Sequence, residues 1–327
     1  MTQKILLLLF ICIAVLSTAA QAQSTSIGPD IPELLSLKQR AAQSVDAGAV
    51  VLSRRADTKV DENGMETQRF YNAIYIASEE AVTDYSKMIS SFNAFYYDKK
   101  IDFARVITPS GAVHEMQKDA ISTVAANSDD YLDDMKRHEF AVPQLKIGNI
   151  IEYQSSSTQI APIIPGQWMS DIHFHFVKFL PQKNWLRIDP VMETINTFEF
   201  PSEMQVNVKN RNTEIEPEIR YTKNRKTYIW RQNNLPGVQL ESNMPPVDRA
   251  LPSVYLSSMQ DWQTIDHWFS DLFAPTQVKD DRVVALAQHL FAGLSTEKDK
   301  IKAVFDYMQR NIRYIGAHVN RGGYQPH

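Results

Sequence analysis

The stretch that decides the fold class is IDFARVI, residues 101–107. Apolar and polar side chains alternate along it with a period of two, the pattern of a strand with one buried face. The turn residues PSG follow at 109–111, and a second alternating stretch, AVHEM, returns at 112–116. Two alternating stretches joined by a short loop that contains glycine predict a β-hairpin.

Short strand-like stretches continue on both sides of this hairpin. Proline and glycine residues separate them, and helical periodicity is almost absent from residue 49 to residue 235. This pattern is typical of a β-sandwich, so we expect an all-β sandwich domain over residues 49–235. Further strands are expected at 49–52, 72–76, 150–153, 172–179, 185–188 and 204–208, and a second hairpin at 219–221 and 227–230.

The first 22 residues have the three parts of a secretory signal peptide. Lys4 gives a basic start, an apolar run extends from Ile5 to Leu16, and the stretch ends in an Ala-x-Ala site at residues 20–22. The apolar run is shorter than the ~20 residues that span a bilayer. We therefore expect residues 1–22 to be removed on export, no membrane span in the mature protein, and a periplasmic or extracellular location.

Charge and cysteine content exclude further classes of function. The chain has 34 basic and 38 acidic residues, a net charge of −4, which argues against nucleic acid as a partner. Cys12 is the only cysteine and lies within the expected signal. The mature protein is therefore expected to lack both thiols and disulfides, and no cofactor is predicted.

The pattern changes from strands to helices near the C-terminus. Residues 236–252 are rich in proline and predict a linker. Over residues 253–327, apolar residues recur at helical spacing in three stretches. Capping boxes are expected at Ser258–Asp261 and at Thr296–Asp299, and Asp280 and Asp281 suit the N-terminal dipole of the second helix. A short helix is also expected in the lead-in, residues 23–48. The helical apolar faces lack a sheet to cover them, so we expect residues 253–327 to form an incomplete domain.

Several motifs resemble those of a known family. They are Pro143–Tyr153, Ile164–Trp168, Phe179–Pro181, Asp261-Trp262, Asn311–Gly316 and Gly322–His327. In these motifs the chain resembles exported bacterial proteins of the transglutaminase-like superfamily that carry an N-terminal β-rich domain of unknown function. The resemblance implies an α+β chain, in which the all-β sandwich domain precedes the helical first part of a transglutaminase-like, papain-like domain.

The resemblance also implies a cysteine site that this chain does not contain. In such sites a histidine activates a cysteine at a helix N-terminus, and a carboxylate orients the histidine. In the family the cysteine lies shortly after the last of these motifs, whereas here no cysteine follows Cys12. We therefore expect a chain truncated before its nucleophile. The family's Cys-dependent acyl transfer or peptidase chemistry assigns no catalytic residue here.

Two histidines are the candidates for a metal site. His173 and His175 alternate within one expected strand, so both imidazoles would point from the same face. They could supply two ligands to zinc, but their spacing identifies no third ligand. The other interpretation is a pair of polar residues on a solvated strand face.

The tryptophans allow two interpretations, and one of them predicts a second function. Trp168, Trp230, Trp262 and Trp268 either belong to the core and to contacts between domains or form a sugar-stacking surface. The alternative to a transglutaminase-like protein is thus a β-sandwich module that binds a cell-envelope protein, peptide or glycan.

Overall fold

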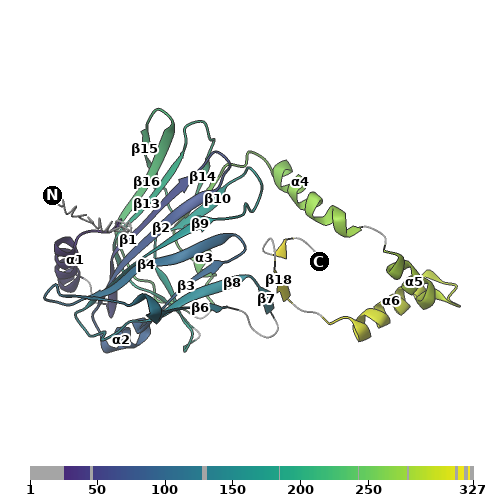
Figure 1. Cartoon of the computed structure of the whole chain (residues 1–327), viewed down its shortest axis with the longest axis horizontal. Coiled ribbons are helices and arrows are strands. Elements are labelled where there is room, and N and C mark those ends of the chain that lie inside the picture. The colour runs from purple at the N-terminus through teal and green to yellow at the C-terminus, as the bar shows by residue number, and fades with distance from the viewer. Residues whose placement is uncertain are drawn as a thin grey trace, which may run out of the picture.

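The computed structural model describes residues 26–44, 47–126, 131–183, 185–241, 243–277, 280–313, 316–319 and 323–324. The expected signal peptide and most of the last motif, residues 322–327, lie outside these ranges. Within them, no helix is long and apolar enough to cross a membrane. A β-rich body holds most of the described chain, and helices extend away from it at the C-terminal end (Figure 1).

An eight-stranded sheet is the centre of the β-rich body. The hairpin predicted at residues 101–116 forms one edge, where Val106 lies opposite His114, and the hairpin predicted at 219–230 forms the other. Within this sheet only the neighbours β1 and β13 are parallel. In spatial order the strands are β15 (Glu218–Tyr221), β16 (Arg225–Leu235), β13 (Val191–Pro201), β1 (Ala49–Val60), β2 (Glu66–Ile76), β9 (Ile150–Gln159), β4 (Tyr97–Ile107) and β5 (Val113–Glu115).

Several small sheets make up the other strands. Two of them have three strands, in the orders β3-β8-β6 and β10-β17-β14, and two have a single pair, β11-β12 and β18-β7. The bounds are β3 (Lys87–Asn93), β6 (Ile121–Ala125), β7 (Tyr131–Asp133), β8 (Met135–Ala141), β10 (Met169–His173), β11 (Val177–Leu180), β12 (Trp185–Ile188), β14 (Asn207–Arg211), β17 (Ser253–Ser257) and β18 (Gly316–His318).

Both three-stranded sheets pack on the same face of the large sheet. Met88 of β3 shares a buried apolar cluster with Ile74 of β2. Because side chains alternate along a strand, Glu66 of β2 points to the same face as Ile74, and its carboxylate meets the indole of Trp168, next to β10. The expected sandwich therefore has a second layer that is divided into small sheets rather than one continuous sheet.

Two sequence expectations about strands need correction. The strand expected at residues 172–179 is two strands, because β10 ends at His173 and β11 begins at Val177. Residues 253–257, which we grouped with the C-terminal helices, form β17, the central strand of a small sheet. The β-rich body therefore extends to residue 257.

One helix covers the opposite face of the large sheet. Helix α1 buries Leu34, Leu37 and Ala41 against apolar side chains of β1 and β2, among them Leu52 and Tyr71. The helices are α1 (Ile31–Ser44), α2 (Glu79–Tyr85), α3 (Val247–Ala250), α4 (Trp262–Phe273), α5 (Asp281–Phe291) and α6 (Glu297–Asn311), with 3-10 turns η1 (Lys118–Ala120) and η2 (Ala274–Gln277).

One of the two predicted capping boxes is confirmed. Asp280 caps α5, and the Thr296 hydroxyl caps α6 by accepting from the N–H of Asp299 at 3.1 Å. At α4 the cap is Asp261, which accepts from the N–H of Thr264 at 3.0 Å. The Ser258 hydroxyl, which we expected to cap α4, instead accepts from the Trp168 N–H, so the predicted box at Ser258 is wrong.

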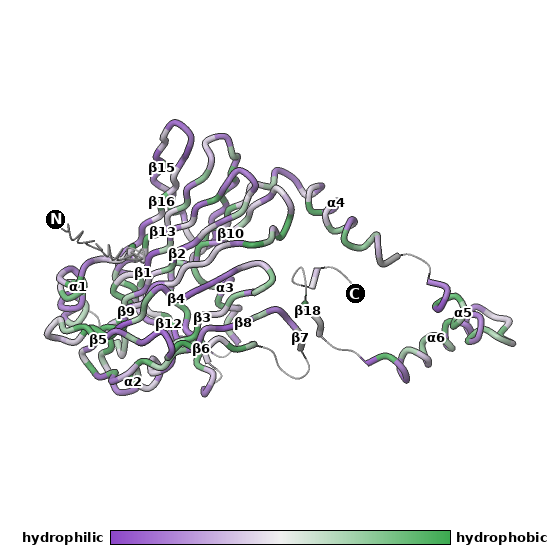
Figure 2. The backbone as a smooth tube through the Cα atoms, viewed as in Figure 1, coloured by the Kyte–Doolittle hydropathy of each residue, from purple (hydrophilic) through white to green (hydrophobic). Residues whose placement is uncertain are grey.

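Apolar side chains remain exposed on the C-terminal helices. Figure 2 shows apolar stretches along α4, α5 and α6, beyond the β-rich body. Trp262 on α4 is 82% exposed and Ile301 on α6 is 70% exposed, whereas Trp168 and Trp230 are buried in the core of the β-rich body.

We predict that the Phe200→Ala substitution destabilises the β-rich body by about 3–5 kcal/mol, because it leaves a cavity in a buried aromatic cluster. Phe200 is fully buried and lies edge-on to Trp168 at 5.0 Å and to Tyr228 at 5.6 Å. Urea unfolding measures the loss. Phe179→Ala is the matched control, since Phe179 is half exposed and its removal should cost far less. Equal losses from both variants would contradict this description of the core.

Candidate functional site

A groove of about 730 Å³ lies where the second layer is divided. The large sheet forms its floor through β2, β4 and β9. Strand β3 forms one wall, and β10 and β17 form the other. The volume lies within the range of about 300–1,000 Å³ that is usual for ligand pockets.

Strand register builds the floor. Gln68 of β2 and Lys99 of β4 both lie opposite Ser157 of β9, so the three side chains form one row across the sheet. Because side chains alternate along β2, Glu66 and Phe70 point into the groove on either side of Gln68. The floor is therefore polar at its centre and aromatic at one end.

Glu66 is a buried carboxylate held by neutral donors. The Tyr97 hydroxyl donates to its Oε1 at 2.9 Å and the Gln68 amide to the same oxygen at 2.8 Å. The indole N–H of Trp168 donates to Oε2 at 2.8 Å. No ion pair with Glu66 is found in the described part of the chain. Burial raises the pKa of Glu66, and the three hydrogen bonds oppose that rise.

Lys99 is the cation of the groove. Burial lowers the pKa of its ammonium group to about 8. The Nζ atom lies 5.7 Å from the centre of the Phe70 ring and 3.5 Å from the backbone oxygen of Ser91. None of the described residues that line the groove is a histidine or a cysteine. Lys99 is thus the one cationic side chain among the described residues that line the groove.

A second cavity lies beside α4. It has a volume of about 560 Å³ and lies between residues 161–165 and the side chains of Trp268 and Leu272 on α4. Ile163 lines both cavities. The groove and the cavity beside α4 therefore adjoin at this residue.

The two candidate metal ligands do not form a pair. Because β10 ends at His173, the alternation that we expected to place both imidazoles on one strand face does not extend to His175. The His173 Nε2 lies 2.5 Å from Asp171 Oδ2, and the His175 Nε2 lies 3.2 Å from the Pro236 carbonyl oxygen. Burial lowers the pKa of His175. Across the described ranges, no group of three or more His, Cys, Asp or Glu residues could hold a metal.

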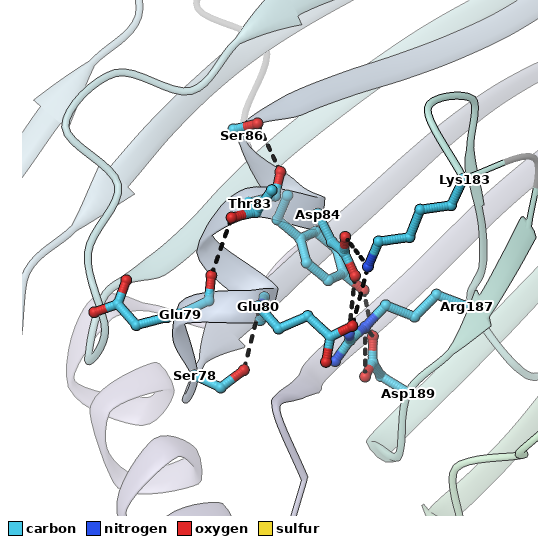
Figure 3. A network of polar contacts seen from close by, with 11 residues as sticks. Ser78, Glu79, Glu80, Thr83, Asp84, Ser86, Lys183, Arg187 and Asp189 are labelled. Carbon is cyan, nitrogen blue, oxygen red and sulfur yellow. Dashed lines mark hydrogen bonds and ion pairs between the residues drawn. The ribbon is translucent and has the colours of Figure 1, made fainter.

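Figure 3 shows a polar cluster that sequence reasoning missed. Asp84 of α2 is buried and pairs with Lys183 Nζ at 2.8 Å and with Arg187 Nη1 at 3.1 Å. Arg187 also pairs with Asp189 at 2.8 Å, and the Tyr85 hydroxyl donates to Asp189 at 2.6 Å. These contacts join α2 to the β11-β12 hairpin. Because about a hundred residues separate the partners, no local sequence signal could have shown them.

The comparisons with known proteins concern the β-rich body and part of the helical segment. A family model described as a domain of unknown function, DUF3857, matches residues 62–239, more than half of the chain. The matched residues include the groove floor and the strand β10. No curated protein matches the chain.

Two solved structures are similar to this chain. A candidate protease from Parabacteroides distasonis ATCC 8503 has a TM-score of 0.65 at 15% identity, over 85% of this chain and 53% of that one. An M1 zinc metallopeptidase from Deinococcus radiodurans has a TM-score of 0.30 at 11% identity, over 64% of this chain and 42% of that one. The first likeness shows a shared fold. The chain spans about half the length of that protein.

We predict that Asp84→Asn lowers the free energy of unfolding by about 1–3 kcal/mol, because it removes the buried anion that Arg187 and Lys183 share and leaves Arg187 paired with Asp189 alone. Thermal or urea unfolding measures this loss. Glu80→Gln is the control: Glu80 also pairs with Lys183, at 3.0 Å, but is largely exposed. It should leave the unfolding midpoint unchanged. A small loss from Asp84→Asn would show that the cluster does not clamp α2.

Glu66 should give the protein a defined pH dependence. Its pKa in the folded state is raised above the ordinary value of 4.5. Its contribution to stability is therefore full below that value and is lost as the pH rises through the folded pKa. We expect wild type to lose stability relative to Glu66→Gln as the pH is raised from about 4.5 to 8.

Urea unfolding at several pH values measures this change. Glu214→Gln, at an exposed position, should keep a constant difference from wild type across the same range. A constant difference for Glu66→Gln as well would contradict the raised pKa.

Proposed function

The chain belongs to the DUF3857 family, and on that premise we propose that it is the non-catalytic, substrate-binding part of an exported transglutaminase-like protein. The groove holds an extended polymer chain of the cell envelope and directs it toward the C-terminal helices. Two features support binding without catalysis. No cysteine follows Cys12 in the sequence, and no histidine or cysteine is found among the described residues that line the groove.

The observation that carries this proposal is that the groove and the cavity beneath α4 adjoin at Ile163, which lines both. We propose that a bound polymer takes the path past Ile163 from the floor of the large sheet to the helical segment. A binding module that served only to recognise its ligand would not require this path. An enzyme that receives its substrate from a binding domain would require it.

The exposed faces of α4, α5 and α6 support the assignment of these helices. Ile301 and Phe305, one helical turn apart on α6, are 70% and 58% exposed, and Val283 on α5 is 64% exposed. Apolar faces of this kind are covered when a domain is complete. We assign the residues after β17, from 258 onward, to the first part of a transglutaminase-like domain. The signal-like stretch at residues 1–22 supports export.

A single cysteine in the groove tests the binding function. In a chain with Cys12→Ser, Met259→Cys places an environment-sensitive fluorophore at a residue that lines the groove. The probes are a library of randomised, end-capped octapeptides and a series of N-acetylglucosamine oligomers. We expect a saturable fluorescence change with one of the two probes.

Gln43→Cys is the matched control, because Gln43 is exposed on α1, on the opposite face of the large sheet. The same fluorophore at that position should not respond. A groove label that responds to neither probe, or a control label that responds as strongly, would contradict the proposed function.

A further inference from the structure

The first observation is the free edge of β10. β10 is the outermost strand of its sheet, and its one partner among the described strands is β17. Just before β10, the N–H of Ser258 donates to the carbonyl of Trp168 at 2.8 Å. Residues that bond their partner alternate with residues that do not in an antiparallel pair. Met169 and Asp171 therefore direct their backbone N–H and C=O groups away from β17.

Arg54, at the end of β10, contacts a backbone carbonyl that points away from β17, as the alternation predicts. His173 is the next residue in the same alternating series, and its carbonyl accepts a hydrogen bond from Arg54 Nη1 at 2.8 Å. Arg54 thus closes one end of the edge. Met169 and Asp171 line the groove, and both side chains are exposed.

The second observation is a matching edge on β3. β3 is the outermost strand of its own sheet. The N–H of Ala94 donates to the carbonyl of Asp134 at 2.8 Å, so the alternation directs the backbone groups of Ser91 and Asn93 away from β8. The Ser91 carbonyl lies 3.5 Å from Lys99 Nζ, which rises from the groove floor. Ser91 and Asn93 both line the groove.

A row of outward backbone groups therefore lines the groove at β10, whereas on β3 the carbonyls of Ser91 and Asn93 already accept from Lys99 Nζ and from the N–H of Tyr96. Such a row is completed by another polypeptide strand, because only a polypeptide backbone repeats N–H and C=O groups at the same spacing. A glycan offers hydroxyl groups without that repeat. Exposed strand edges beside a pocket are the feature used by domains that bind peptides by strand addition.

We infer that the groove binds an extended peptide segment of a substrate protein by strand addition to the edge of β10, with the other side of the peptide facing β3. This inference rests on the proposed binding function and specifies the class of polymer. Main-chain hydrogen bonds hold the peptide, and alternate side chains of the peptide face Phe70, Gln68 and Lys99 on the floor.

A substitution in the edge strand β10 tests the inference from the side of the protein. Asp171→Pro removes one outward N–H and leaves the bonds to β17 in place, because proline is tolerated at edge positions whose N–H faces solvent. With the Met259→Cys label and the octapeptide library, we expect binding about tenfold weaker, the effect of one lost hydrogen bond. Asp171→Ala removes the same side chain and keeps the N–H, so it should bind within about twofold of wild type. A thermal melt confirms that both variants fold.

A change in the ligand tests the same point without altering the protein. The same octapeptide library, N-methylated at every backbone nitrogen, keeps its side chains and loses all its main-chain donors. We expect its binding to be lost. Equal binding of the methylated library, or binding of the N-acetylglucosamine oligomers in place of peptides, would overturn strand addition and leave the binding function intact. No response to any of the probes would overturn both.

Discussion

The indole ring of Trp168 packs edge-on against Phe198 and Phe200 of the large sheet, at 5.7 and 5.0 Å, while its N–H donates to the buried carboxylate of Glu66. Trp168 comes directly before β10, so this one side chain anchors the small sheet of β10 beside the groove floor. The backbone of Trp168 adds a second contact, because its carbonyl accepts a hydrogen bond from the N–H of Ser258, the residue after β17. The position of one groove wall, the edge that β10 presents and the burial of Glu66 all depend on this contact.

Burying the charged groups of the groove floor costs free energy. The fold does not need charged groups at these positions. Glu66 is 4% exposed and has only neutral hydrogen-bond partners in the described residues. Lys99 is held beside an aromatic ring with a lowered pKa. A core that served stability alone would contain apolar side chains at such positions. Polar groups retained at this cost agree with the proposed role of the floor in meeting a ligand.

Local signals in the sequence were sufficient for the hairpin of β4 and β5 and for the cap at Thr296, because each depends on residues within a few positions of one another. The division of the second layer could not be predicted in this way. β17 follows a proline-rich segment and has only five residues, so its pattern did not stand out from the helices that follow. Ser258 was assigned to a helix cap because the competing partner, Trp168, lies 90 residues away in the sequence.

The candidate site was beyond sequence reasoning for the same reason. Glu66 begins a strand and belongs to no motif, and its donors Tyr97 and Trp168 come from other parts of the chain. The histidines that the sequence did single out lie at the end of β10 and in the bend after it, where strand alternation no longer relates them.

The central claim of this account is that β10 presents an open edge to the groove, and amide hydrogen exchange tests it most directly. In the free protein, resolved residue by residue by NMR, the N–H groups of Met169 and Asp171 should exchange orders of magnitude faster than those of Ser170 and Ile172, which bond β17. Uniform slow exchange from Met169 to Ile172 would show that another segment already covers this edge, and it would contradict the account.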